Sequence, residues 1–206
     1  MKTILRVALS AMFMLLPGGI HAETAVQSKP IQTDYLNSIK ITFLSWSTGS
    51  TKISYERALP NLNQSSEICG SLICAGYDKY DNNPLGFTVR YGHKFFFGER
   101  ELSLKGFYLR PELIYSYYHY NCTSTGLHNC KASNAREKAA MCALLGTAGY
   151  QYIHKRFLAD FWFGAGYAYG NPADTGYHHG FQLWDYLGTS HDNIALSFTI
   201  RLGFCF

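Results

Sequence analysis

Isolated charged residues recur at alternate positions inside apolar stretches of this 206-residue chain. Arg110 and Glu112 are two residues apart, and residues with this spacing on a β-strand face the same side, so we expect them to form an ion pair. A common strand register places eight charged side chains on one face, namely Lys40, Glu56, Arg90, Lys94, Arg110, Glu112, Asp160 and Arg201. Charges enclosed away from water are costly unless they are paired. We therefore expect an interlocking charge network, with an ion path as the alternative.

Histidines and cysteines in two polar stretches are the next candidates for chemistry. The stretches hold His119, Cys122, His128 and Cys130, and His178, His179 and His191. They could bind zinc or copper if the thiols stayed reduced, but their spacings match no established site, so no metal site or other cofactor is predicted. Cys122 and Cys130 bracket a polar stretch that can fold back, which predicts a disulfide. The other cysteines, Cys69, Cys74, Cys142 and Cys205, are expected to be small buried hydrophobes.

A serine hydrolase would need a nucleophile and a base on the same face. Ser116 and His119 are three residues apart and would point to opposite faces of a strand, and the chain has no His-x-Ser pair. We therefore expect a protein that is not an enzyme. A triad assembled across different strands stays open, and it would make the protein an outer-leaflet lipid acyl transferase or hydrolase.

Composition sets the class of protein. The chain is 47% hydrophobic, 16% aromatic and 16% charged, against about 25% charged in an ordinary soluble domain, which excludes disorder. Residues 1–22 resemble a cleaved signal peptide, with Lys2 and Arg6 before an apolar run from Val7 to Leu16 that is too short to span a membrane. Residues 23–37 are polar with no periodicity, and we expect them to form a leader that lies in the periplasm after export. The net charge of +4 loses two units with the signal, too little for a nucleic-acid partner.

Alternation with a period of two dominates residues 38–206. Large apolar residues such as Phe198 and Phe204 face one side, and small or charged ones such as Gly203 and Arg201 face the other. We expect eight strands near 38–47, 51–59, 66–77, 84–97, 106–120, 139–153, 156–169 and 192–206. A soluble sandwich also alternates, but its polar face would carry many Lys and Glu. The small, mixed-charge face suits the interior of a narrow barrel, so the predicted fold is all-β, an eight-stranded antiparallel up-and-down transmembrane barrel.

Strand connections and aromatic residues give the expected orientation. Connections near 60–65, 98–105 and 154–155 are short inner turns, and those near 48–50, 78–83, 121–138 and 170–191 are outer loops. Aromatic girdles are expected at both rims. The outer girdle would comprise Tyr115, Tyr117, Tyr118, Tyr120, Tyr167 and Tyr169, and the inner one Phe95, Phe96, Phe97, Phe107, Tyr108 and Phe157.

Three segments resemble small Gram-negative outer-membrane barrels of the OmpA, OmpX and OmpW-like group. They are Tyr55-Glu56-Arg57-Ala58-Leu59, Lys105-Gly106-Phe107-Tyr108-Leu109-Arg110-Pro111, and the alternating last strand that ends at Phe206. Over residues 38–206 the pattern is most similar to uncharacterised members with a signal peptide and a single barrel. The resemblance implies an outer-membrane location and recognition of Phe206 by the barrel-assembly machinery.

The expected function follows from the barrel and the resemblance together. We expect a non-enzymatic protein with a structural or surface-interaction role in the cell envelope. Its partners would be outer-membrane lipids, lipopolysaccharide and an extracellular ligand at loops 121–138 and 170–191.

Overall fold

The computed structural model describes residues 35–43, 45, 50–59, 63–74, 83–97, 103–121, 136–170 and 194–206. The predicted signal peptide, most of the leader, the Cys122–Cys130 disulfide and most of the two long loops lie outside these residues. No helix among the described residues is both long enough and apolar enough to cross a membrane.

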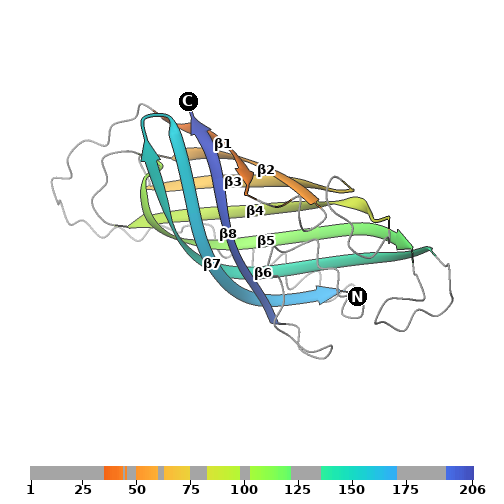
Figure 1. Ribbon diagram of the computed structural model, residues 1–206. Helices are drawn as coiled ribbons and strands as arrows, with labels where there is room; N and C mark the ends of the chain where they lie inside the picture. The colour runs from red at the N-terminus through yellow and green to blue at the C-terminus, as the bar shows by residue number, and fades with distance from the viewer. Residues whose placement is uncertain are drawn as a thin grey trace.

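Eight antiparallel strands form a closed barrel in which each strand pairs with its neighbours in sequence and β1 pairs with β8 (Figure 1). The strands are β1 (Asn37–Thr42), β2 (Ser50–Leu59), β3 (Gln64–Ile73), β4 (Leu85–Phe97), β5 (Gly106–Asn121), β6 (Arg136–His154), β7 (Phe157–Gly170) and β8 (Ile194–Cys205). The predicted all-β, eight-stranded, up-and-down barrel is therefore confirmed.

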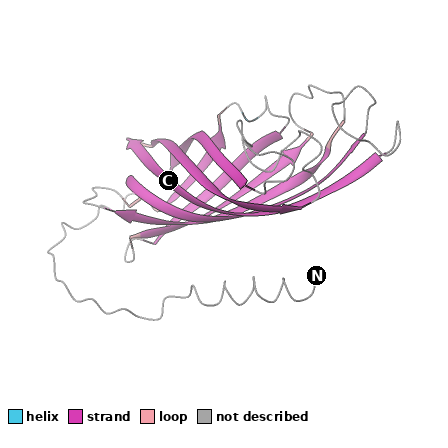
Figure 2. Ribbon diagram, turned by 90° about the horizontal axis from the view of Figure 1, so that it is seen from below, coloured by secondary structure: helices cyan, strands magenta, loops and turns pink. Residues whose placement is uncertain are grey.

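The strand register fixes the tilt of the barrel wall. Starting at Ile39 on β1 and moving from each residue to its partner on the next strand, the path around the barrel reaches Ile194 on β8. It passes through Tyr55, Ile68, Tyr91, Leu113, Leu144 and Tyr167. In the direct pairing of β1 with β8, however, Ile39 lies opposite Phe204. One circuit therefore shifts by ten residues. With strands about 4.8 Å apart and a rise of about 3.3 Å per residue, this stagger tilts the strands by about 40°, and Figure 2 shows them crossing obliquely.

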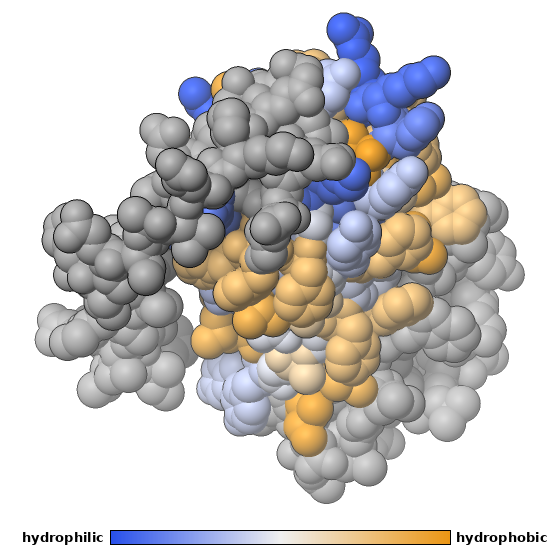
Figure 3. Space-filling model, turned by 90° about the vertical axis from the view of Figure 1, so that its left-hand side faces the viewer, coloured by the Kyte–Doolittle hydropathy of each residue, from blue (hydrophilic) through white to orange (hydrophobic). Residues whose placement is uncertain are grey.

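The alternation of side chains separates the two faces of the wall. Large apolar residues point outward and stay exposed, among them Leu144, Phe163 and Phe198. Figure 3 shows hydrophobic side chains spread over the visible wall, with strongly hydrophilic ones at its upper edge. Small, hydroxyl and charged residues point inward and are buried. In the described strands, the large apolar side chains therefore enclose most of the charged ones.

Some predicted boundaries and faces are wrong. β1 ends at Thr42 rather than near 47, because the backbone N–H of Lys52 on β2 donates to Ser45 Oγ (3.3 Å) instead of to a strand carbonyl. β3 spans 64–73 rather than 66–77. Phe96, Tyr108 and Tyr118 were assigned to the girdles, but they are buried inside the barrel, as period-two alternation beside outward-facing neighbours requires.

The cysteine prediction is half right. Cys69 and Cys205 are buried, and all four cysteines of the set are free. Cys74 and Cys142 are exposed, and Cys142 shares the outer face of β6 with Leu144. The sequence suggested small buried hydrophobes because cysteine is apolar, yet an outward-facing position on this wall accepts an apolar residue equally well.

The barrel has two unlike ends. The chain enters β1 and leaves β8 at one end, where 60–63, 98–105 and 155–156 connect neighbouring strands. At the other end the connections 43–49, 74–84, 122–135 and 171–193 are mostly longer. The two ends are called the termini end and the loop end below.

Candidate functional site

Apolar side chains fill the lumen at the termini end. Ala58, Leu104, Ile153, Leu158 and Cys205 form a buried cluster with Tyr35 packed against it. Leu104 comes from the connection before β5 rather than from a strand, and it is fully buried. Leu104 therefore contributes to the floor of the lumen.

Three carboxylates and two ammonium groups meet above that floor. Lys40 Nζ lies 2.5 Å from Glu56 Oε2 and 3.2 Å from Asp160 Oδ2, and it also contacts Glu67 Oε2. Lys94 Nζ contacts the same carboxylates, at 3.2 Å from Glu56 and Glu67 and 2.8 Å from Asp160. Because each ammonium bridges all three carboxylates, the cluster links β1, β2, β3, β4 and β7 across the lumen.

Neutral side chains complete the hydrogen bonding of this cluster. Tyr108 Oη donates to Asp160 Oδ1 (2.6 Å), and Ser65 Oγ donates to Glu56 Oε1. Lys94 Nζ donates to Gln151 Oε1 (2.5 Å), whose amide nitrogen in turn donates to Glu56 Oε2 (3.2 Å). Hydrogen bonds of this kind offset the desolvation of buried charges.

Two arginines form the next layer with Glu67 and Trp162. Arg110 Nη1 lies 3.1 Å from Glu67 Oε1, and Arg201 Nη1 contacts the same oxygen. Both guanidinium groups also stack on the Trp162 ring, at 4.5 Å for Arg110 and 4.2 Å for Arg201. Glu67 therefore contacts four cations, and the indole ring keeps two like charges side by side through cation–π attraction.

Arg90 and Glu112 make the tightest two-point contact of the lumen. Arg90 Nε and Nη2 each lie 3.0 Å from a different carboxylate oxygen of Glu112. The predicted partner, Arg110, also reaches Glu112, but at 3.3 Å through a single nitrogen. Two parallel contacts fix the geometry of an arginine–carboxylate pair better than one, so Arg90 is the main partner of Glu112.

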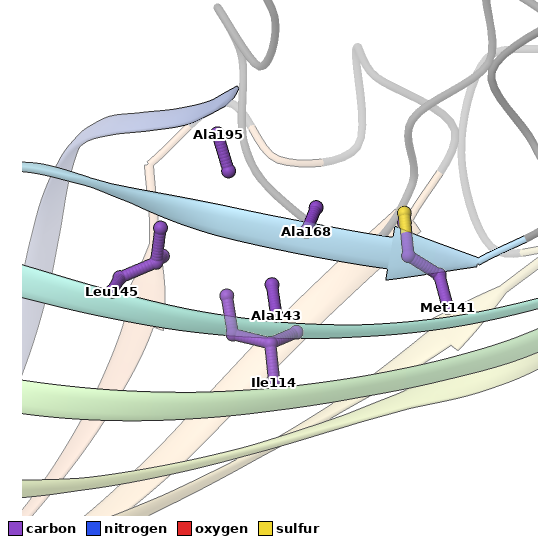
Figure 4. Close-up of a cluster of buried hydrophobic side chains, with 6 residues drawn as sticks. All are labelled: Ile114, Met141, Ala143, Leu145, Ala168 and Ala195. Atoms are coloured by element: carbon purple, nitrogen blue, oxygen red, sulfur yellow. The ribbon is translucent and has the colours of Figure 1, made fainter. Parts of the chain in front are cut away.

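The lumen lining changes towards the loop end. Ile114, Met141, Ala143, Leu145, Ala168 and Ala195 form a buried apolar cluster on β5, β6, β7 and β8 (Figure 4). Hydroxyl groups line part of the remaining wall, where Thr88 and Ser116 are hydrogen-bonded at 2.9 Å. The charge network thus lies between an apolar floor and a partly apolar upper wall.

All eight charged residues selected from the sequence point into the lumen, each at most 2% exposed. The structure adds four that sequence reasoning missed, which are Lys52, Glu67, Tyr108 and Gln151. Among the described lumen side chains there are six cations and four carboxylates. Lys52 lies on the same face of β2 as Glu56, so extending the alternation by four residues would have found it.

Glu56, Glu67 and Asp160 lie close enough together to share a metal ion, because their oxygens are within 4.8 Å of one another. The Lys40 and Lys94 ammonium groups already bridge these oxygens. The arrangement therefore satisfies the negative charge from within the protein and makes a salt-bridge cluster rather than a cation site.

Comparison with protein-family models, with curated proteins and with solved structures returns no match to this chain. The function therefore has to be argued from the geometry of the barrel.

Proposed function

We propose that this chain is an outer-membrane β-barrel protein of a Gram-negative cell envelope, with a lumen closed by its charge network. Its role in this proposal is structural or surface-interacting, and the lumen performs no catalysis. The observation that carries the proposal is the inverted polarity of the wall, which exposes large apolar side chains and buries ten charged ones.

The exposed apolar surface supports a lipid environment. Outward-facing residues such as Ile68, Leu144 and Phe163 are all more than half exposed, and they recur around the whole wall. Water-soluble monomers rarely expose contiguous apolar patches larger than a few hundred Å². In a bilayer the same surface faces acyl chains, and the closed barrel satisfies every strand edge, as a spanning sheet requires.

The ion pairs support a closed lumen because they connect opposite walls. Lys94 on β4 reaches Asp160 on β7, and Arg201 on β8 reaches Glu67 on β3. An eight-stranded barrel has an interior just wide enough for side chains. The apolar floor around Leu104 lies below these bridges, so bulk permeation would have to displace both layers.

Conductance across a planar bilayer tests the closed lumen. Purified wild-type protein is expected to give no stable open channel, because the paired side chains fill the lumen. The variant Trp162→Ala combined with Arg110→Ala, Arg201→Ala and Leu104→Ala should create flickering conductance, since it removes the stacked layer and opens the apolar floor. Gly70→Ala on the outer face is the matched control. A large, stable wild-type conductance would contradict the closed-lumen proposal.

The long connections at the loop end are where a surface-interaction role would act. This proposal assigns outer-membrane lipid, lipopolysaccharide or an extracellular ligand to residues 121–138 and 170–191. Shortening either loop should preserve the barrel and abolish binding of that lipid or ligand. A purely structural role predicts instead that shortening a loop changes no binding, and that cells lacking the protein have a detergent-sensitive envelope.

A further inference from the structure

A polar group interrupts the apolar outer face on β3 and β4. Gln64 and Ser66 of β3 and His93 of β4 all face outward and are only partly buried. Tyr91 and Phe95 flank His93 along its strand on the same face. Among the described strands, no other histidine, lysine, arginine or carboxylate on the outer face has aromatic neighbours on both sides. His93 therefore lies inside the aromatic girdle rather than beyond it.

These side chains form a hydrogen-bonded chain. Ser66 and His93 are direct cross-strand partners, and Ser66 Oγ lies 3.1 Å from His93 Nδ1. His93 Nε2 lies 2.9 Å from Gln64 Oε1, on the diagonal position of the same strand pair. The His93 ring also packs edge-on against Phe95, with a centroid distance of 4.9 Å. Three contacts therefore fix the orientation of the imidazole.

The contacts decide which imidazole nitrogen carries the proton. The amide oxygen of Gln64 can only accept a hydrogen bond, so His93 Nε2 must be the donor. In a neutral imidazole the other nitrogen is then an acceptor, and Nδ1 points its lone pair at the Ser66 hydroxyl. A hydroxyl facing an oriented imidazole acceptor is the arrangement of an activated serine nucleophile.

The surroundings of Ser66 offer groups for a charged ester. Arg57 is its cross-strand partner on β2 and faces outward. Tyr91 Oη lies 3.5 Å from Ser66 Oγ on the other side. A guanidinium is suited to a phosphate, and a phenol can donate to an oxyanion. Ser66 thus lies between the Arg57 position on β2 and the Tyr91 hydroxyl on β4, on the outer face.

The depth of the group matches the ester region of a lipid leaflet. His93 lies four residues from the end of β4, which corresponds to about 10 Å along the axis of a barrel tilted by about 40°. Interfacial segments bury their apolar face about 5–10 Å into the boundary between headgroups and acyl chains, so a group at this distance from the strand end can meet the ester region of a lipid. Polar residues placed there are costly and mark functional positions.

We propose that Ser66 and His93 form a serine-esterase centre on the outer wall, with Gln64 as the positioning residue, acting on acyl esters of phospholipids in the leaflet at the termini end. This goes beyond the closed-lumen barrel, and its failure would leave that proposal intact. Sequence spacing leaves a cross-strand centre open, but it predicts one in the outer leaflet, whereas Ser66 and His93 lie at the termini end.

The reaction is a two-step acyl transfer. Ser66 Oγ bonds to the ester carbonyl carbon while His93 Nδ1 takes the hydroxyl proton. The ester C–O bond then breaks, and the departing alcohol oxygen receives that proton from His93. Water attacks the acyl-serine in the same way, which releases the fatty acid and restores Ser66. Ser–His centres are recognised by geometry and roles rather than by sequence order.

A fluorophosphonate probe tests the nucleophile directly. The folded wild-type barrel in detergent should form a covalent adduct that mass spectrometry maps to Ser66, with fluoride as the leaving group. Labelling should disappear in Ser66→Ala and fall by about 100-fold or more in His93→Ala. Ser54→Ala, which removes a serine facing the lumen from β2, should label like wild type. No adduct, or an adduct at another residue, overturns the proposal whether or not the variants fold.

Hydrolysis assays test the positioning residue and the substrate. Gln64→Leu should lower kcat for p-nitrophenyl octanoate, and Gln64→Glu should restore it, because a carboxylate accepts the same Nε2 proton. Arg57→Gln should raise KM for phosphatidylglycerol vesicles without changing KM for the uncharged ester. Equal rates in Gln64→Leu and Gln64→Glu would refute the positioning role. An unchanged KM for the vesicles in Arg57→Gln would refute phosphate binding by Arg57, and no hydrolysis of the vesicles by the wild type would exclude a phospholipid substrate.

Discussion

Two polar regions of this barrel, the lumen network and the Ser66–His93–Gln64 chain, are built in opposite ways. In the lumen every charge of the central cluster has several partners, and Glu67 alone contacts four cations. On the outer face the three side chains form a single row, and Ser66 Oγ contacts only His93 Nδ1 and, at 3.5 Å, Tyr91 Oη among the described side chains. The lumen also encloses ten charges, whereas the outer row contains neutral groups.

The difference separates structure from reactivity. A charge held by several short contacts cannot leave its partners without a large energetic cost, so the lumen network fixes the wall and blocks the interior. A hydroxyl on the partly exposed outer face, with an imidazole as its acceptor, can meet a substrate. Burial and hydrogen bonding alone therefore do not identify a reactive site. Whether a group can react depends on how many contacts hold it and on whether a substrate can reach it.

Glu67→Leu should have the largest effect on stability, because it leaves four cations of the lumen without their shared partner. We expect a loss of about 3–5 kcal/mol in the free energy of unfolding, measured by urea unfolding in lipid vesicles. Ile68→Leu, the adjacent residue on the outer face, is the control and should change stability by less than about 1.5 kcal/mol. Similar losses for both variants would mean that the network does not stabilise the barrel.

Leu144→Arg tests the opposite face. Leu144 is 62% exposed in the middle of β6, and an arginine at the bilayer midplane costs about 2–4 kcal/mol, falling to about 0–1 near the interfaces. Leu85→Arg, at the loop end of β4, supplies the shallow control. The same unfolding assay should rank Leu144→Arg well below Leu85→Arg. Equal, near-zero effects would indicate a wall that faces water.

Two glycines contrast the packing of the faces. A Cβ at Gly149 would lie 2.5 Å from Tyr108 Oη, the group that holds Asp160, whereas a Cβ at Gly70 on the outer face meets nothing within 4 Å. Gly149→Ala should cost about 1–3 kcal/mol, and Gly70→Ala should be neutral or stabilising by up to about 1 kcal/mol. Thermal unfolding of the two variants provides the comparison, and the reverse order would argue against a packed lumen.

A double-mutant cycle on Arg90 and Glu112 measures the smallest effect. Arg90→Met leaves Glu112 with the weaker contact to Arg110, and Glu112→Leu removes the carboxylate that Arg90 binds, whereas the double variant removes both charges of the pair. The coupling energy should be at least about 0.5 kcal/mol and favourable, obtained from the urea midpoints. Additive losses would show that the two 3.0 Å contacts contribute no net coupling.

The fold could be predicted from the sequence because period-two alternation is strong on most strands. The prediction placed β3 correctly but shifted its bounds, because Gln64 and Ser66 put polar side chains on the outer face and weaken the alternation. For the same reason, the inward orientation of Glu67, which lies between Ser66 and Ile68, could not be recognised from the sequence. The inward orientation of Tyr108 and Phe96 was also missed, because both lie in runs of adjacent aromatic residues. Such a run matches the girdle pattern even though one of two neighbouring residues on a strand must face inward.

The candidate site was predictable only in part, for a physical reason. Within one strand, odd and even positions point to opposite faces, so the inward-facing charged residues could be selected from the sequence. Contacts between strands depend on register, which the turns and the whole barrel fix together. Ser66 and His93 are 27 residues apart, and no local pattern states that they are cross-strand partners. Arg90 as the main partner of Glu112 was missed for the same reason.

Electrophoretic mobility of the outer-membrane fraction, with and without boiling, tests the central claim that the apolar wall meets lipid. A closed barrel in the membrane should resist SDS, stay with carbonate-washed membranes and shift in mobility only after heating. Protein released by the carbonate wash, with one mobility at both temperatures, would contradict the account and make the outward phenylalanines and tyrosines part of a water-facing assembly.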